Sequence, residues 1–132
     1  MSSKPIDVVR AAYAAFGRGD GAAVLAANDP STVWTLHAPP SHPYGGVFKG
    51  VDGVGRFLGA LMGHVDMLEF APEEFTAEGN LVTVTGRETI KAKSTGKTLS
   101  HRWIQLFEVR GGKIVRFEEW YDTAKVIELF RK

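Results

Sequence analysis

The sequence predicts an α+β fold in which helices pack on one face of a curved antiparallel sheet. Two observations favour it. Apolar residues in the first half recur mostly at helical spacing, whereas those from Met67 onward alternate with polar residues between glycine-containing turns. A chain of 132 residues has the length of one domain, so we expect one domain over residues 1–132.

The N-terminal segment predicts two helices. Four apolar residues recur there at helical spacing: Ile6, Val9, Tyr13 and Phe16. Because Pro5 suits a first helical turn, we expect the first helix to begin there and to end at Gly17-Arg18-Gly19. Asp20 can cap a second short helix, which Asn28-Asp29-Pro30 would stop.

A strand, a loop and a third helix follow. Residues 32–37 predict a strand, and residues 38–46, with adjoining prolines and two glycines, predict an irregular loop. An apolar stripe at helical spacing predicts a helix over residues 51–64. The glycines of this helix lie four residues apart, and we interpret them as a surface for close packing: Gly55, Gly59 and Gly63.

Four alternating segments complete the predicted sheet: 67–77, 81–93, 98–109 and 113–121. Gly79-Asn80, Thr95-Gly96 and Gly111-Gly112 separate them and are typical of tight turns, so we expect an antiparallel meander. Asp122 or Thr123 then caps a last short helix.

The alternation also separates the two faces of each late strand. We assign these side chains to the more apolar face, which would meet the helices: Glu88, His101, Trp103, Gln105, Glu119 and Tyr121. Burial raises the pKa of a carboxyl group and lowers that of an imidazole, which brings both toward the range where proton transfer is efficient. The pattern therefore indicates a pocket with acid/base chemistry.

A second interpretation stays open. A Glu–His–Glu set can also be a satisfied internal network that only stabilises the sheet. We interpret Glu88 and His101 as pocket residues, and Glu119 fits either interpretation. Trp34 and Tyr44 are candidates for the rim or lid of the pocket, with the direction of Trp34 left open.

Several function classes are not expected. The chain has no cysteine, which excludes disulfides, thiolate catalysis and iron–sulfur clusters, and it has no dinucleotide or Walker motif. His37 and His42 do not match a zinc spacing, so we interpret His42 as a surface loop residue and expect no metal. A net charge of +1 and the absence of a long apolar run disfavour nucleic acid and membrane partners. Since the N-terminus lacks a signal-peptide pattern, we expect a cytoplasmic protein.

A family resemblance covers nearly the whole chain. It is carried by five motifs: Arg18-Gly19-Asp20, Pro43-Tyr44-Gly45-Gly46-Val47-Phe48-Lys49-Gly50, His101-Arg102-Trp103, Gly112-Lys113-Ile114-Val115 and Glu119-Trp120-Tyr121-Asp122-Thr123. With these motifs the chain resembles the nuclear-transport-factor-2-like superfamily, particularly its SnoaL-like, ketosteroid-isomerase-related branch. The resemblance implies a cystatin-like conical α+β barrel wrapped round N-terminal helices, a pocket between sheet and helices, and a homodimer formed through the sheet.

The resemblance also suggests site positions. Ketosteroid isomerase uses an Asp base with a Tyr and a protonated Asp as oxyanion donors. Tyr13 falls near that Tyr, whereas the base position falls around Thr35 and the protonated acid at Trp103. SnoaL-type polyketide cyclases use a histidine and an acid from the late strands, for which His101 with Glu119 or Asp122 are the candidates.

We therefore expect a cofactor-free acid/base enzyme of the isomerase, cyclase or dehydratase type, acting on a small apolar carbonyl compound. The expected catalytic residues are Glu88, His101 and Glu119. The expected substrate-binding residues are Tyr13, Trp34, Tyr44, Trp103, Gln105 and Tyr121. The alternative is a non-catalytic ligand-binding or dimeric interaction module of the same fold.

Overall fold

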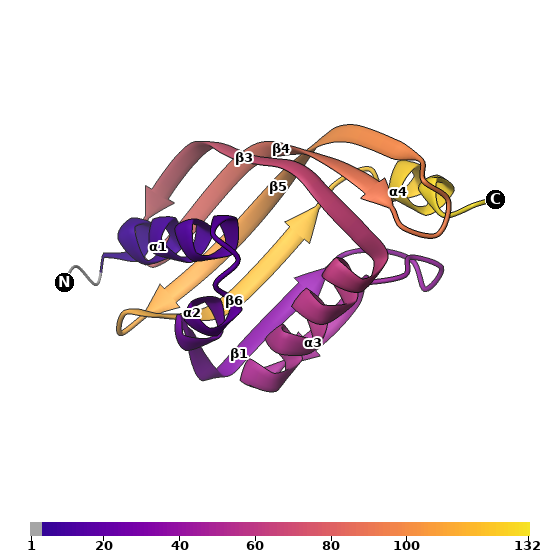
Figure 1. Ribbon diagram of the computed structural model, residues 1–132. Coiled ribbons are helices and arrows are strands. Elements are labelled where there is room, and N and C mark those ends of the chain that lie inside the picture. Colours follow the sequence, from indigo (N-terminus) through magenta and orange to yellow (C-terminus); the bar gives the residue numbers. More distant parts are fainter. Residues whose placement is uncertain (1–3) are drawn as a thin grey trace.

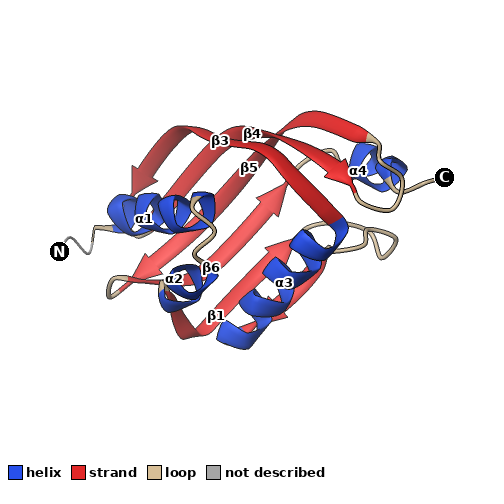
Figure 2. Cartoon of the chain, viewed as in Figure 1, coloured by secondary structure: helices blue, strands red, loops and turns tan. Residues whose placement is uncertain are grey.

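A curved sheet with helices on its inner face forms the structure, a computed structural model that describes residues 4–132 (Figures 1 and 2). The elements in chain order are α1 (Pro5–Gly17), α2 (Gly21–Ala26), β1 (Asn28–Leu36), β2 (Gly46–Lys49), α3 (Gly50–His64), β3 (Val65–Glu78), β4 (Leu81–Ala92), β5 (Thr98–Arg110), β6 (Lys113–Trp120) and α4 (Thr123–Leu129). The six strands lie in the order β2-β1-β6-β5-β4-β3. The expected α+β fold class, with a curved sheet and N-terminal helices, is confirmed. The sheet is open, with β2 and β3 at its edges.

Strand β1 differs from the expectation in both length and direction. It begins at Asn28, where the sequence predicted the end of a helix, and it pairs with β6 in parallel, whereas every other pair in the sheet is antiparallel. The register shifts between Asn28 and Val33, so a bulge accommodates Pro30, which cannot donate to the ladder. The Asn28 side chain is buried and accepts hydrogen bonds from Thr32 and Trp34.

The short strand β2 was not predicted. It has four residues, lies at a sheet edge and pairs antiparallel with β1. A segment this short carries too few alternating positions to be separated from the preceding loop. Its pairing draws the chain back along β1 and directs it into α3.

The face assignment of the late strands is confirmed for β4 and β5, whose predicted inner side chains are buried in alternation. In β6, Phe117 and Glu119 are buried as predicted, but Ile114 is buried in place of Val115. The reason is a register shift: Glu108 pairs with Arg116 and Val109 with Ile114, so Val115 has no partner and the alternation reverses there.

The glycine row of α3 does not pack closely. A Cβ added at Gly59 would meet nothing within 4 Å, and the same holds at Gly63, so that interpretation was wrong for both. Gly55 lies only at ordinary contact distance from Leu25. The close approach occurs at Gly53, where a Cβ would lie 2.8 Å from the carbonyl carbon of Phe48.

Two large apolar side chains remain exposed on the outer face of the sheet. Ile104 is 46% exposed and Trp120 is 38% exposed, and these residues pair across β5 and β6. The homodimer expected through this sheet stays a prediction. Within residues 4–132, no helix combines the length and the apolar character that a membrane crossing requires.

The wall of aromatic rings under α1 depends on a glycine. Gly86 of β4 pairs with Trp103 of β5, and a Cβ at Gly86 would lie 2.5 Å from both the Trp103 ring and the carbonyl oxygen of Ala71. The missing side chain lets the buried Trp103 indole lie against β4 and stack on Phe70, with ring centroids 5.1 Å apart. No other residue fits at this position without displacing backbone.

We therefore predict that Gly86→Ala lowers the free energy of unfolding by about 1–3 kcal/mol, because the added methyl group overpacks the Trp103 contact. Gly59→Ala is the matched control. It lies on the exposed side of α3 with open space around it, and should raise the free energy of unfolding by about 0.5–1 kcal/mol through helix propensity. Urea denaturation measures the free energy of unfolding of both variants. An unchanged value in Gly86→Ala would contradict the close packing of Gly86 against Trp103.

Candidate functional site

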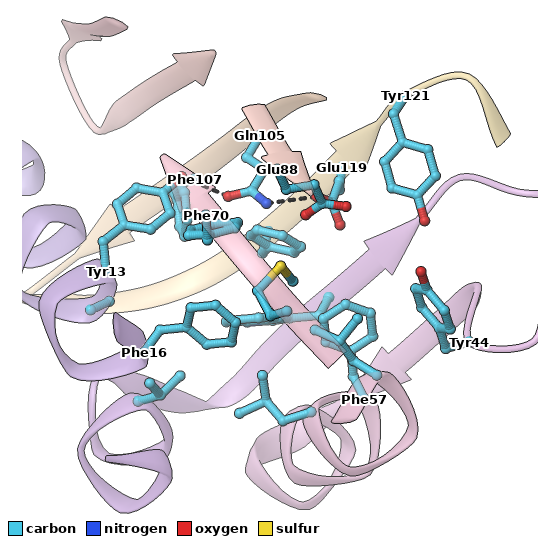
Figure 3. A pocket seen from close by; sticks show the side chains of 17 residues that line it. Tyr13, Phe16, Tyr44, Phe57, Phe70, Glu88, Gln105, Phe107, Glu119 and Tyr121 are labelled. Carbon is cyan, nitrogen blue, oxygen red and sulfur yellow. Dashed lines mark hydrogen bonds between the residues drawn. The ribbon is translucent and has the colours of Figure 1, made fainter. Parts of the chain in front are cut away.

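A largely apolar cavity lies between the inner face of the sheet and helices α1, α2 and α3; we call it the inner cavity (Figure 3). Apolar side chains make most of its wall, and the polar side chains that reach it come from α1, the loop before β2, and β4 to the end of β6: Tyr13, Tyr44, Glu88, Gln105, Glu119 and Tyr121. Its volume is about 60 Å³. Since one water needs about 10–15 Å³ on this measure, it has room for roughly four to six non-hydrogen atoms.

Two carboxyl groups lie at the polar end of this cavity. Glu88 comes from β4 and Glu119 from β6, with β5 between them, and Figure 3 shows their carboxyl groups beside each other. Each uses its Oε2 atom for one hydrogen bond to a neighbour, and no bond to either Oε1 atom occurs among residues 4–132. Each group therefore keeps one oxygen for a ligand.

Burial and a neighbouring negative charge shift the pKa of Glu119. Glu119 is only 6% exposed, and desolvation together with the negative charge of Glu88 raises the pKa of Glu119 from 4.5 to about 8. The hydrogen bond from Gln105 opposes this shift without cancelling it. At neutral pH Glu119 is thus predominantly a protonated carboxylic acid.

A hydrogen-bonded chain from α1 orients Glu119. The Tyr13 hydroxyl donates to Oε1 of Gln105 at 2.6 Å, and Nε2 of Gln105 donates to Oε2 of Glu119 at 2.7 Å; dashed lines in Figure 3 mark the Gln105 bonds. Because Oε1 of Gln105 can only accept and its Nε2 can only donate, each end of the amide has one role. Burial raises the pKa of Tyr13, which keeps its hydroxyl a neutral donor.

His101 lies behind Glu88 and does not line the cavity. Its Nε2 is 2.8 Å from Oε2 of Glu88, and both side chains are almost completely buried. The imidazole ring meets the Tyr121 ring edge-on, with centroids 4.9 Å apart. His101 can therefore orient Glu88, but the carboxylate stands between it and the cavity.

The two candidate tryptophans occupy different places. Trp34 lines the cavity, donates through Nε1 to Oδ1 of Asn28 at 2.8 Å, and stacks on Phe117 with centroids 4.2 Å apart. Trp103 is behind the lining, where its ring stacks on both Phe70 and Tyr13, which also contact each other. The Trp34 side chain thus points inward, a direction that the sequence left open. Trp103 packs behind the cavity wall and does not reach the cavity.

The expectation that His42 is a surface residue was wrong. It is 5% exposed because the loop folds inward around Gly45, where a Cβ would lie 2.7 Å from the Ala38 side chain and 3.3 Å from His42. Burial and the neighbouring His64 lower the pKa of His42 to about 4, so the ring is neutral at physiological pH.

His42 orients the Tyr121 hydroxyl. Its Nδ1 accepts the backbone N–H of Tyr44 at 3.2 Å, so the neutral ring carries its proton on Nε2. That N–H donates to the Tyr121 oxygen at 2.6 Å. The Tyr121 proton is then available to a second acceptor, either the Tyr44 oxygen that faces it in Figure 3 or a ligand.

Tyr44 brings a buried hydroxyl to the same end of the cavity. Its ring is 3% exposed, whereas the sequence suggested a rim or lid position. The hydroxyl makes no hydrogen bond of normal geometry among residues 4–132. Burial is the main cause that raises the pKa of Tyr44 and of Tyr121, which leaves both as neutral phenols able to donate.

Other positions suggested by the family resemblance lie outside the cavity. Asp122 is exposed and accepts the Lys125 N–H as the N-cap of α4. Thr35 pairs with Glu118 on the outward-facing register of β1. Over the described part of the chain, no three His, Asp or Glu side chains come together in a way that could hold a metal ion.

The sequence thus predicted most of the polar side chains that line the cavity, but it did not predict the burial of His42. Alternation identified Glu88, Gln105 and Glu119, since all three lie on regular strands. The loop of residues 38–46 has no period, and only its adjoining prolines and its two glycines indicated an irregular loop of the kind that often covers a site.

Comparisons with known proteins agree with this architecture. Residues 9–117 match the SnoaL-like domain. The uncharacterized protein Rv0034 of Mycobacterium tuberculosis is 32% identical over 125 residues, which cover 95% of this chain and 94% of that protein.

Two solved structures superpose over nearly the whole chain. An NTF2-like protein of unknown function from Burkholderia pseudomallei is 32% identical, covers 100% of both chains and gives a TM-score of 0.88. TerC, co-crystallized with polyporic acid, is 27% identical, covers 99% of this chain and 100% of its own, and gives a TM-score of 0.86. The chain belongs to the SnoaL-like domain family of the nuclear-transport-factor-2-like superfamily.

Proposed function

We propose that this protein is a cofactor-free acid/base enzyme that moves a proton next to the carbonyl group of a small, mostly apolar compound. One observation carries the proposal: two carboxyl groups share a largely apolar cavity, and Glu119 favours the protonated form beside the charged Glu88. A carboxyl group that stays protonated at neutral pH can donate a hydrogen bond to an oxygen on which negative charge develops.

In the proposed reaction, Glu88 is the base. Its Oε1 takes a proton from the carbon next to the carbonyl, so the C–H bond breaks and its electron pair moves into an enolate. Glu119, as a carboxylic acid, donates a hydrogen bond to the carbonyl oxygen on which the negative charge develops. Return of the proton to another carbon gives isomerisation, attack of the enolate on a second carbonyl gives aldol cyclisation, and loss of a neighbouring hydroxide gives dehydration.

Three hydrogen-bonding partners hold these groups in place; His101 and His42 lie outside the lining and Gln105 is part of it. His101 orients Glu88, Gln105 links Glu119 to Tyr13, and His42 turns the Tyr121 proton toward the cavity. His101 is therefore proposed as a positioning residue and not as a group that touches the substrate. Tyr121 and Tyr44 supply further donors for a ligand oxygen.

The rival function is ligand binding without catalysis. A fully cross-paired Glu88–His101–Glu119 network with no space beside it would favour that rival. The structure instead has space at the carboxyl groups and one oxygen on each without a hydrogen bond among residues 4–132, which supports the enzyme. The co-crystallization of TerC with polyporic acid supports small-molecule binding under either function.

Deuterium exchange tests the proposal without the natural substrate. In heavy water the protein is expected to speed the exchange of the α-protons of butanone, followed by proton NMR. Glu88→Gln should slow the protein-dependent rate by at least about 100-fold, since a general base contributes on that order.

Glu128→Gln is the matched control for this experiment. It makes the same chemical change on the exposed side of α4, in an ion pair with Arg131, and should leave the rate unchanged. Exchange no faster than in buffer alone, or equal rates in Glu88→Gln and the unmutated protein, would contradict the role of Glu88.

The proposed role of Glu119 predicts a pH profile. Protein-dependent exchange should fall as pH rises through about 8, because Glu119 then loses the proton with which it stabilises the enolate oxygen. Glu119→Gln keeps an N–H donor at this position. Its exchange rate should be lower than that of the unmutated protein and should not fall as pH rises through about 8. A rate that stays constant across this pH range in the unmutated protein would exclude Glu119 as the acid.

Protonation of Glu119 should also make the free energy of unfolding depend on pH. Between pH 4.5 and 8 the folded protein retains a proton on Glu119 that the unfolded chain releases, so the free energy of unfolding falls as pH rises. His42 acts in the opposite direction between pH 4 and 6.5, since only the unfolded chain protonates it there. The window from pH 6.5 to 8 therefore isolates Glu119.

Urea denaturation at both ends of this window measures the effect. The unmutated protein should lose on the order of 1–2 kcal/mol relative to Glu119→Gln between pH 6.5 and 8. Parallel pH dependence in the two proteins would mean that Glu119 is already ionised when folded.

A further inference from the structure

A second hollow of about 410 Å³ adjoins the inner cavity; we call it the outer groove. It lies between the connection of α1 to α2 on one side and the junction of α3 with β3 on the other. Figure 1 shows these two segments facing each other across the helical side of the sheet. Five side chains line both spaces: Phe16, Val24, Leu58, Met67 and Phe70. These five side chains thus form a partition between the inner cavity and the outer groove.

Local backbone features keep the groove empty and apolar. Gly17, Gly19 and Gly21 line it, and a Cβ at any of them would meet nothing within 4 Å, so bare backbone leaves the space open. On the other side the register of β3 shifts between Met67 and Glu69. Leu68 lies at this shift and is 57% exposed.

The partition has a movable component. Phe16 and Phe70 meet edge-on, with ring centroids 5.0 Å apart. Met67 stands beside them, and its unbranched side chain has rotatable bonds that let it refill space of changing shape. Met67 is therefore the side chain of the partition that adapts most easily to a ligand.

The charges around both spaces select against anions. Neither lining contains a Lys, Arg or His residue, and the inner end carries Glu88 and Glu119. Glu69 on the rim of the groove is paired with Arg87, so it presents no free negative charge to a ligand. A neutral molecule with an apolar body fits this distribution.

We propose that the outer groove is the second half of the ligand site and holds the apolar tail of an elongated, neutral carbonyl compound. This inference rests on the proposed function, which places the carbonyl end beside Glu88 and Glu119. The inner cavity holds only a handful of atoms, and the outer groove adjoins it at Met67, where the rest of a longer ligand fits.

A series of methyl alkyl ketones, from butanone to methyl heptyl ketone, tests this. Amide chemical-shift titrations of the nitrogen-15-labelled protein give the Kd of each ketone and show where it binds. Once the alkyl chain exceeds the inner cavity, Kd should tighten by about fourfold for each methylene buried. The Gly17, Gly19 and Gly21 amides should shift with the long ketones and not with butanone.

Variants on the exposed rim check the assignment without touching the core. Leu68→Ser and Met62→Ser should each reduce the affinity ratio between methyl heptyl ketone and butanone by at least about threefold, since each removes apolar contact area. Leu81→Ser is the matched control: Leu81 is 40% exposed and lines neither space, so the ratio should not change.

The outcomes separate the two proposals. If butanone shifts the amides around Glu88 and Glu119 but longer ketones bind no tighter, the outer groove is not part of the site and the proposed function stands. If long ketones bind tightly without shifting the groove amides, the tail lies elsewhere and the inference is wrong. If no ketone of the series binds, both proposals are contradicted.

Discussion

The hydrogen bond from Gln105 to Glu119 is the interaction on which the site depends. It lies where β5 meets β6, with the donor and the acceptor directly paired in the ladder. The same amide accepts from Tyr13, so one side chain joins helix α1 to the sheet. A buried carboxyl group without a partner costs several kcal/mol. The hydrogen bond from Gln105 reduces this cost for Glu119, while burial still raises the pKa of the group.

Each of three polar groups in the cavity has a hydrogen-bonding partner that orients it. His101 supports Glu88, Gln105 supports Glu119, and His42 supports Tyr121. Two of these partners are themselves held by hydrogen bonds, Gln105 from Tyr13 and His42 from the backbone N–H of Tyr44. This arrangement pre-organises donors and acceptors in a largely apolar space, where electrostatic interactions are stronger than in water.

Packed aromatic rings form the rigid wall beside the cavity. Trp103 stacks on both Phe70 and Tyr13, and Gly86 makes room for the indole. The position that the family resemblance aligned with a catalytic acid is therefore used for packing. The carboxyl groups of the proposed reaction lie elsewhere in this chain, on the inner face of β4 and β6.

The sequence by itself determined the faces of the late strands. Side chains alternate with a period of two on a regular strand, so Glu88, Gln105 and Glu119 could be assigned inward from the alternation of apolar and polar residues. Alternation does not say how far along a strand the cavity extends. His101 shares the inner face of β5 with Gln105 and yet lies outside the lining, because it stands behind Glu88.

Only the tertiary structure decided the remaining features. The parallel pairing of β1 with β6 joins segments distant in sequence, and the bulge at Val115 reverses an alternation that looked continuous. The burial of His42 depends on how an aperiodic loop folds against Tyr121, which no local pattern encodes. The outer groove likewise arises where two connections face each other, since its shape depends on contacts between segments and not on the period of either one.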